Sequence, residues 1–125
     1  MYVRWLLMKA LVVEDDSNTR YALSRIVGSA GYTVVSAATG LDALSLANHH
    51  PIDLLVTDWD LGSGLTGLDV ANYLKAHCAT VPVIFITGKS TDCLTALTKT
   101  FSDSYILAKP VSAFDLRFTI RQAER

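Results

Sequence analysis

The chain has 125 residues, of which half are hydrophobic, and a formal net charge of −1 at pH 7. Its length suits one domain with a single substantial core, and its hydrophobic content excludes a disordered chain. The near-neutral charge, without a basic run, gives no electrostatic reason to expect binding to nucleic acid or to a membrane surface. The apolar stretch 5–8 is too short to span a bilayer and lacks a small-residue cleavage site. We therefore expect a cytoplasmic single domain over 1–125, with a core from about 8 to 124 and a short N-terminal extension at 1–7.

Strand-like and helix-like stretches alternate along the whole chain. Short apolar, β-branched runs predict strands at about 10–14, 33–37, 53–58, 83–87 and 104–108. Apolar residues at helical spacing, bounded by polar residues, glycine and proline, predict helices at about 17–30, 40–50, 68–78, 91–100 and 112–125. Five strand–helix units with short connections predict an α/β fold, with a parallel sheet covered by helices on both faces.

Two of the predicted strands end in carboxylates. Glu14 and Asp15 follow the first strand, and Asp58 and Asp60 end the third. If these two strands are neighbours, their carboxyl ends bring the acids into one pocket, where like charges repel one another unless a cation is bound. Asp16 has two roles open to it, as a third acid of the first group or as the N-cap of the first helix, and we favour the cap.

The fourth and fifth strands add a hydroxyl, Thr87, and an ammonium, Lys109, to the same edge. Ligands of such sheets bind at the carboxyl ends of the strands. Two or three carboxylates, a backbone carbonyl and water molecules suffice to hold Mg²⁺. A metal, an ammonium and a hydroxyl around Asp58 would stabilise a transferring phosphoryl group, and an aspartate so placed can become an aspartyl phosphate.

Four short motifs carry a family resemblance: Leu11–Asp16, Val56–Asp58, Ile86–Gly88 and Lys109–Pro110. In order and spacing they resemble the receiver domain of two-component response regulators. The resemblance implies a flavodoxin-like, doubly wound five-stranded parallel sheet with strand order 2-1-3-4-5. It implies a phosphoacceptor of bacterial phosphorelay signalling and not an enzyme, with self-phosphotransfer and slow autodephosphorylation as its only chemistry. A histidine kinase or a histidine phosphotransfer protein would be the phosphoryl donor.

The resemblance also implies a role for each of the acids. Asp58 would be the phosphorylated residue. Glu14 and Asp15, together with Asp58 and the backbone carbonyl of Asp60, would hold Mg²⁺ or Mn²⁺.

Around these acids the resemblance implies two catalytic or switch residues, one cis peptide bond and two modulating positions. Thr87 would bond a phosphoryl oxygen and shift toward it on activation, Lys109 would pair with the phosphoryl group, and the bond before Pro110 is expected to be cis. Asp60 and Lys89 stand two residues beyond the phosphoacceptor and Thr87, at variable positions that influence how water reaches the phosphoryl group. We expect Lys89 to pair with Asp60 or with the phosphoryl oxygens and to slow hydrolysis.

The sequence departs from the family in two places. Gly62 stands where a proline is usual, and Gly67 comes about one residue late, which favours a more mobile loop after Asp58. In the family, an aromatic switch residue often stands three positions before the lysine that corresponds to Lys109. Here that position is Ile106, and Tyr105 stands one place earlier. Either a local bulge returns Tyr105 to the switch position or the aromatic switch is absent, and we favour its absence.

The last predicted helix carries two apolar stripes. The stripe that contains Leu116 should pack on the sheet, and the stripe that contains Phe114 and Phe118 should be exposed. Receivers commonly dimerise or bind targets through the face made by the helix at 91–100, the strand at 104–108 and the last helix. We therefore expect a phosphorylation-sensitive homodimer or target interface there.

Two alternative functions are compatible with parts of the sequence. Asp58-Trp59-Asp60 resembles the nucleophile–acid pair of haloacid-dehalogenase-like phosphatases. That motif normally opens the chain and precedes its acidic metal pair, whereas Glu14 and Asp15 come first here, and the chain has no room for a cap domain. A degenerate receiver that acts only as a binding module is the second alternative, and the complete set of acids, threonine and lysine argues against it.

Overall fold

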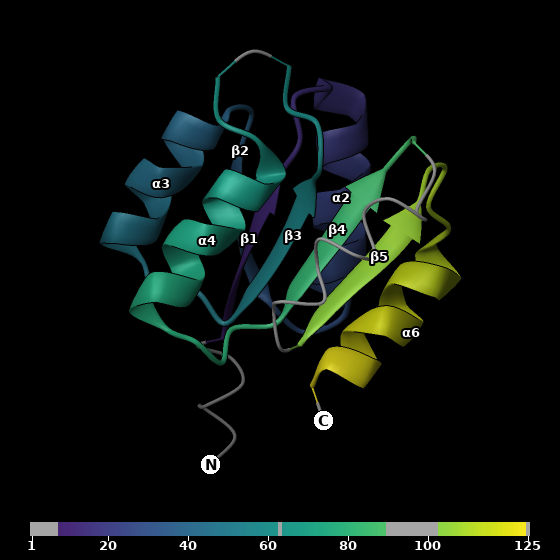
Figure 1. Ribbon diagram of the computed structural model, residues 1–125. Coiled ribbons are helices and arrows are strands. Elements are labelled where there is room, and N and C mark those ends of the chain that lie inside the picture. The colour runs from purple at the N-terminus through teal and green to yellow at the C-terminus, as the bar shows by residue number, and fades with distance from the viewer. Residues whose placement is uncertain (1–7, 63, 90–102, 125) are drawn as a thin grey trace.

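The computed structural model describes residues 8–62, 64–89 and 103–124 (Figure 1). The strands are β1 (Lys9–Val13), β2 (Thr33–Ala37), β3 (Leu54–Asp58), β4 (Val83–Thr87) and β5 (Ser104–Ala108). The helices are α2 (Ser17–Ser29), α3 (Gly40–His49), α4 (Gly67–His77) and α6 (Ala113–Ala123). All strand pairs are parallel and their order is β2-β1-β3-β4-β5, so the predicted fold is confirmed. The helix expected at 91–100 lies outside the described residues.

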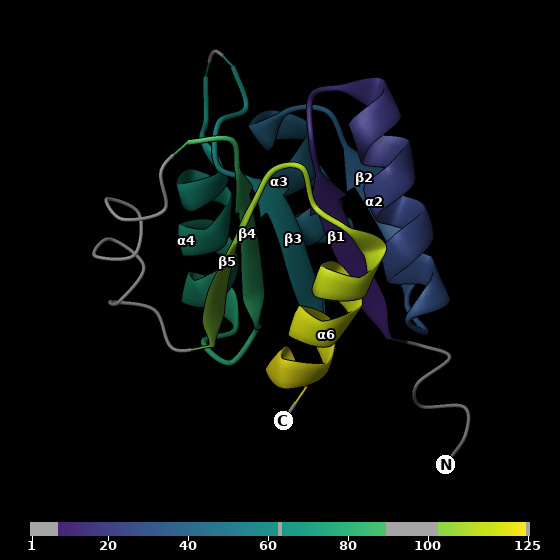
Figure 2. The same ribbon diagram turned by 90° about the vertical axis from the view of Figure 1, so that its right-hand side faces the viewer.

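The sheet separates two apolar layers (Figure 2). On one face, α3 and α4 pack through side chains such as Ala43 and Val70 against Leu11, Leu55 and Phe85. On the other face, α2 and α6 pack against the alternate residues of the same strands. Strands β3 and β4 are buried along their whole length. This explains why they read as continuous apolar runs in the sequence. Within the part of the chain that the structure describes, no helix is long and apolar enough to cross a membrane.

Each described helix begins at a polar N-cap. Thr39, Thr66 and Ser112 cap α3, α4 and α6, and each side chain accepts a hydrogen bond from a backbone N–H of the first turn. The Asp16 carboxylate caps α2, accepting from the backbone N–H of Thr19 at 2.9 Å and from its hydroxyl at 2.7 Å. Both bonds lower the pKa of Asp16. The expectation that Asp16 is a cap is therefore confirmed.

Two tyrosine hydroxyls hold the last turn of α6. Tyr32, the residue before β2, donates to Oε2 of Glu124 at 2.7 Å, and Tyr105 in β5 donates to the carbonyl of Gln122 at 3.3 Å. Burial, reinforced by the bond to Glu124, raises the pKa of Tyr32, so its hydroxyl remains a donor at neutral pH. The C-terminal turn of α6 is thereby attached to both edge strands of the sheet.

The start of α4 lies directly against the end of β3. A Cβ atom on Gly67 would come within 2.1 Å of the carbonyl oxygen of Asp58 and 3.1 Å of the Thr57 hydroxyl. The first contact is with backbone and not with a flexible side chain, so a larger residue would move the strand end that carries Asp58.

We expect Gly67→Ala to lower the free energy of unfolding by about 1–3 kcal/mol, because the added methyl overpacks a buried junction. Gly28→Ala is the matched control, since its Cβ would have only Val34 within reach, at 4.0 Å, and alanine favours the helix. Denaturant unfolding of both variants measures the difference. An unchanged midpoint for Gly67→Ala would show that the junction is loose.

Candidate functional site

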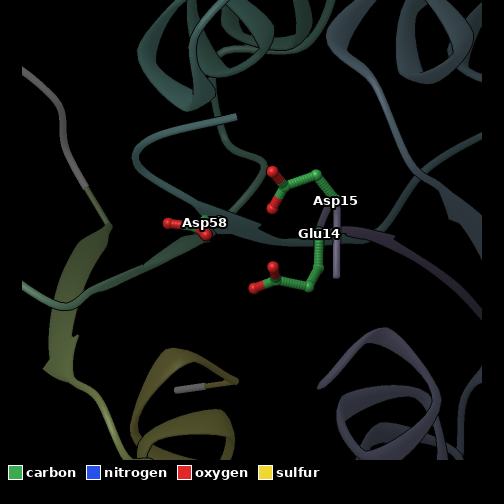
Figure 3. Close-up of side chains that lie close together, drawn as sticks. All are labelled: Glu14, Asp15 and Asp58. Carbon is green, nitrogen blue, oxygen red and sulfur yellow. The ribbon is translucent and has the colours of Figure 1, made fainter. Parts of the chain in front are cut away.

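The carboxyl edge of the sheet gathers three acids. Glu14 and Asp15 follow β1 and Asp58 ends its neighbour β3. Figure 3 shows their carboxylates directed toward one another, and each contributes an oxygen that lies within 4.8 Å of the others. The prediction that these two strand ends share one pocket is thus confirmed in its geometry.

Glu14 is the most deeply buried of the three acids, with none of its surface exposed. Its Oε2 accepts a hydrogen bond from the backbone N–H of Asp16 at 3.1 Å. Its Oε1 is buried and accepts no hydrogen bond from any residue that the structure describes, although the ammonium of Lys109 lies 3.1 Å away. Burial raises the pKa of Glu14, and the nearby Asp15 and Asp58 carboxylates act in the same direction.

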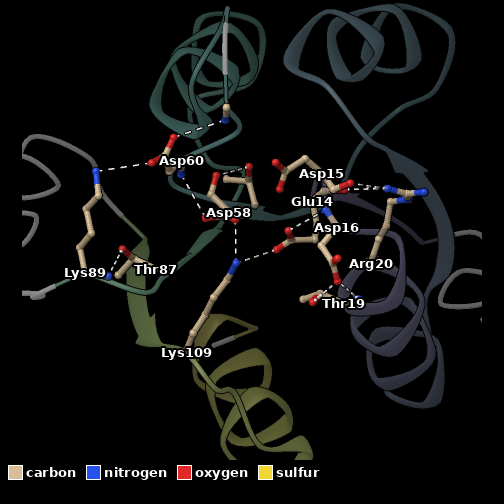
Figure 4. A network of polar contacts seen from close by, with 12 residues as sticks. Glu14, Asp15, Asp16, Thr19, Arg20, Asp58, Asp60, Thr87, Lys89 and Lys109 are labelled. Carbon is tan, nitrogen blue, oxygen red and sulfur yellow. Dashed lines mark hydrogen bonds and ion pairs between the residues drawn. The ribbon is translucent and has the colours of Figure 1, made fainter.

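Lys109, the residue after β5, places one ammonium between two of these acids (Figure 4). Its Nζ lies 2.8 Å from Oδ2 of Asp58 and 3.1 Å from Oε1 of Glu14. Burial acts to lower the pKa of Lys109, but the neighbouring carboxylates of Asp58 and Glu14 outweigh it, and the net shift is upward. Among the described residues, the Lys109 ammonium thus pairs with two of the three clustered carboxylates, and the acids outnumber the cation that contacts them directly.

Asp58 lies at the floor of this pocket with almost none of its surface exposed. One carboxylate oxygen, Oδ2, is bonded to Lys109, and the other, Oδ1, accepts from the backbone N–H of Asp60 at 3.0 Å. Its orientation is therefore fixed from both sides. The pocket is lined by Asp15, Asp58, Asp60, Gly62, Thr87, Gly88, Lys89 and Lys109.

The rim of the pocket brings together Thr87, Lys89 and Asp60. The Thr87 hydroxyl is buried and accepts from the backbone N–H of Lys89 at 3.0 Å. The ammonium of Lys89 lies 3.4 Å from Oδ2 of Asp60, with 70% and 57% of the two side chains exposed. This ion pair joins the loop after β4 to the loop after β3, in agreement with the pairing expected from the sequence.

Strand β5 places Tyr105 and Ile106 on opposite faces of the sheet. Tyr105 pairs with Ile84 and Ile106 with Phe85 in an unbroken parallel register. Tyr105 packs on the α2–α6 side, and Ile106 packs on the α3–α4 side. The possibility that a bulge returns Tyr105 to the switch position is therefore wrong, because strand alternation is uninterrupted. The bond between Lys109 and Pro110 is cis, as expected.

The donor set of the pocket fits a small divalent cation. All three clustered side chains offer carboxylate oxygens, the ligand type that Mg²⁺ and Mn²⁺ prefer. The buried Oε1 of Glu14, which lacks a hydrogen bond in the described structure, has a lone pair available for a metal or for a water molecule bound to it.

Sequence reasoning missed two residues that touch the backbone of this site. Arg20, in the first turns of α2, donates from Nη1 to the carbonyls of Glu14 at 2.8 Å and Asp15 at 3.4 Å. The Thr57 hydroxyl donates to the carbonyl of Asp58 at 2.9 Å. Both act on main-chain atoms, and a sequence pattern carries no signal for such contacts.

A doubly wound parallel sheet with three acids, a threonine and a lysine at the carboxyl ends of its strands is typical of the flavodoxin-like class, which binds ligands at this edge. The family model of the response regulator receiver domain matches residues 10–121. The chain therefore belongs to the receiver domains of two-component systems, which are signalling domains that bind Mg²⁺ at an acidic pocket and interact with histidine kinases or phosphotransfer proteins.

Known relatives contain this domain within longer proteins. The chain is 36% identical to the positive alginate biosynthesis regulatory protein of Pseudomonas aeruginosa, over 94% of the chain and 48% of that protein. It is 31% identical to a cyclic di-GMP phosphodiesterase of Thermotoga maritima, over 94% of the chain and 31% of that protein. The chain thus spans half or less of these relatives. A receiver domain structure from Clostridium thermocellum superposes with a TM-score of 0.80 at 28% identity, covering 94% of each chain.

We expect Mg²⁺ to change the fluorescence of Trp59, which is half-buried beside Asp58. Its ring packs edge-on against that of Phe85, with the ring centroids 5.0 Å apart. Asp15→Asn should weaken the apparent affinity at least tenfold, because a ligand charge is lost from an all-oxygen site. Asp42→Asn, which removes an exposed acid on α3, is the control for net charge and should bind as the original chain does. A Trp59→Phe variant identifies the source of the signal, and equal Mg²⁺ affinities for the Asp15 and Asp42 variants would contradict the site.

Proposed function

We propose that Asp58 accepts a phosphoryl group from the phosphohistidine of a histidine kinase or a histidine phosphotransfer protein, and that this phosphorylation switches a partner-binding surface. The observation that carries the proposal is the setting of Asp58. Its buried carboxylate lies at the floor of a pocket, bonded to Lys109 and grouped with two further acids.

In the proposed transfer, an oxygen of Asp58 attacks phosphorus while the bond from phosphorus to the donor imidazole nitrogen breaks. The electron pair of that bond leaves with the imidazole. Lys109 moves its ammonium from the Asp58 carboxylate to the phosphoryl oxygens, and the Thr87 hydroxyl donates to another of them. Bound Mg²⁺ would supply positive charge to the phosphoryl oxygens, and its ligands would be Glu14, Asp15, Asp58 and the backbone carbonyl of Asp60.

The surface proposed to respond is the exposed side of α6 and its neighbours. Phe114 and Phe118 are 74% and 55% exposed, and their rings stack with centroids 6.4 Å apart. Exposed aromatic pairs of this kind commonly mark protein interfaces. We propose that they form part of a homodimer or target interface together with β5, in a cytoplasmic signalling domain that is not itself an enzyme. The segment 91–100, which the sequence predicts as part of the same face, lies outside the described residues.

Incubation with a small phosphodonor such as acetyl phosphate and Mg²⁺ should add the mass of one phosphoryl group to the chain. Asp58→Asn should abolish the addition, because the amide is not a nucleophile for phosphorus, and EDTA should do the same. Asp42→Asn controls for a general loss of acid. Absence of the adduct on the original chain would overturn the proposal, and continuous release of phosphate from the donor without an adduct would favour the phosphatase alternative instead.

The ion pair at the rim should set the lifetime of the phosphorylated state. Removing the Lys89 ammonium opens the pocket mouth to water, so Lys89→Ala should shorten the half-life of the adduct by about two- to fivefold, as suits an exposed pair. Asp60→Ala should act similarly, and the double variant should add little to either single change. Additive effects, or an unchanged half-life in Lys89→Ala, would show that the pair does not act on hydrolysis.

A further inference from the structure

Arg20 makes a contact that helix formation does not require. It lies in the first turns of α2, and its guanidinium reaches back across the start of the helix to the strand end before it. There Nη1 donates to the carbonyl of Glu14 at 2.8 Å and lies 3.4 Å from the carbonyl of Asp15. Both carbonyls belong to residues of the acidic cluster. Among the described residues, the hydrogen bonds from Arg20 to Glu14 and Asp15 go to these carbonyls and not to the carboxylates.

The Glu14 carbonyl needs a donor because the chain leaves the sheet at this point. The β1 ladder ends at Val13, and the Glu14 N–H still donates to the carbonyl of Ala37 at 3.1 Å. After that bond the backbone turns into the N-cap of α2, and the pairing of β1 with β2 and with β3 does not extend to Glu14. Glu14 is fully buried, where an unpaired carbonyl is unfavourable by about 1–3 kcal/mol. Arg20 supplies that missing partner.

The same contact places a permanent positive charge behind the acids. Figure 4 shows Arg20 on the side of Glu14 and Asp15 that faces away from Asp58 and Lys109. The guanidinium is a half-buried cation. It therefore offsets part of the repulsion among the carboxylates without occupying the space between them. The Lys109 ammonium, in contrast, lies between Glu14 and Asp58.

We propose that Arg20 is a positioning residue for divalent-cation binding, fixing the backbone of Glu14 and Asp15 so that their carboxylates stay directed into the pocket. The inference rests on the proposed function, because it concerns the cation that supports phosphoryl transfer. Groups that orient metal ligands without touching the metal typically change its affinity ten- to a hundredfold when they are removed. Arg20 would act in this way through main-chain atoms.

The test compares Arg20→Met, Arg20→Lys and the control Arg25→Met, which removes an exposed arginine of the same helix. Mg²⁺ is titrated against each variant with Trp59 fluorescence as the readout, and thermal unfolding is measured separately in EDTA. Arg20→Met should bind Mg²⁺ about ten- to a hundredfold more weakly. Arg20→Lys, which keeps the charge but not the forked donors, should fall between it and the original chain, and Arg25→Met should bind normally.

The readouts separate positioning from stability alone. A lower unfolding temperature in EDTA with an unchanged Mg²⁺ affinity of the folded protein, in either Arg20 variant, would overturn the inference. If Arg20→Met does not fold, Arg20→Lys decides, and an affinity within twofold of the original chain would again overturn it. If the original chain binds no Mg²⁺, the proposed function fails and the inference fails with it. Normal Mg²⁺ binding by both the original chain and the Arg20 variants refutes the inference alone.

Discussion

The repulsion among three carboxylates at one end of the sheet is the constraint on which the rest of the site depends. Two like charges about 5 Å apart repel by about 3 kcal/mol at the effective dielectric constant of a protein site. Glu14, Asp15 and Asp58 approach this closely because parallel strands β1 and β3 are neighbours and end together. Lys109 on one side and Arg20 on the other offset part of this repulsion. The backbone N–H groups of Asp16 and Asp60, which donate to the Glu14 and Asp58 carboxylates, offset a further part. The compensation is incomplete, and this remaining negative charge is what suits the pocket to a cation.

The elements that position this site could be predicted from the sequence for a simple reason. Strands β3 and β4 are buried on both faces, so their sequences are predominantly apolar. Their ends are marked by polar residues, Thr57 and Asp58 in β3 and Thr87 in β4. The helix starts were equally readable, because each cap is a side chain that bonds its own first turn. Local chemistry of this kind is present in the sequence itself.

Contacts that depend on distant backbone could not be predicted. Nothing in the sequence around Arg20 indicates that it bonds carbonyls on the preceding strand end, and nothing around Gly67 indicates that its missing side chain admits the carbonyl of Asp58. The switch position on β5 could be predicted in part. Alternation along β5 favoured Tyr105 facing away from Ile106, and only the register with β4 excluded a bulge. The side of the sheet that faces α4 therefore carries an aliphatic residue at this position.

The two tyrosine bonds at the end of α6 have a mechanical consequence. Tyr32 precedes β2 and Tyr105 lies in β5, and these are the two outermost strands of the sheet. The end of α6 is hydrogen-bonded near both edges of the sheet. Rotation of one edge relative to the other would therefore lengthen at least one of these two bonds. A displacement of β5 would therefore act on the end of α6 through Tyr105, and through α6 on the Tyr32 bond at the opposite edge of the sheet.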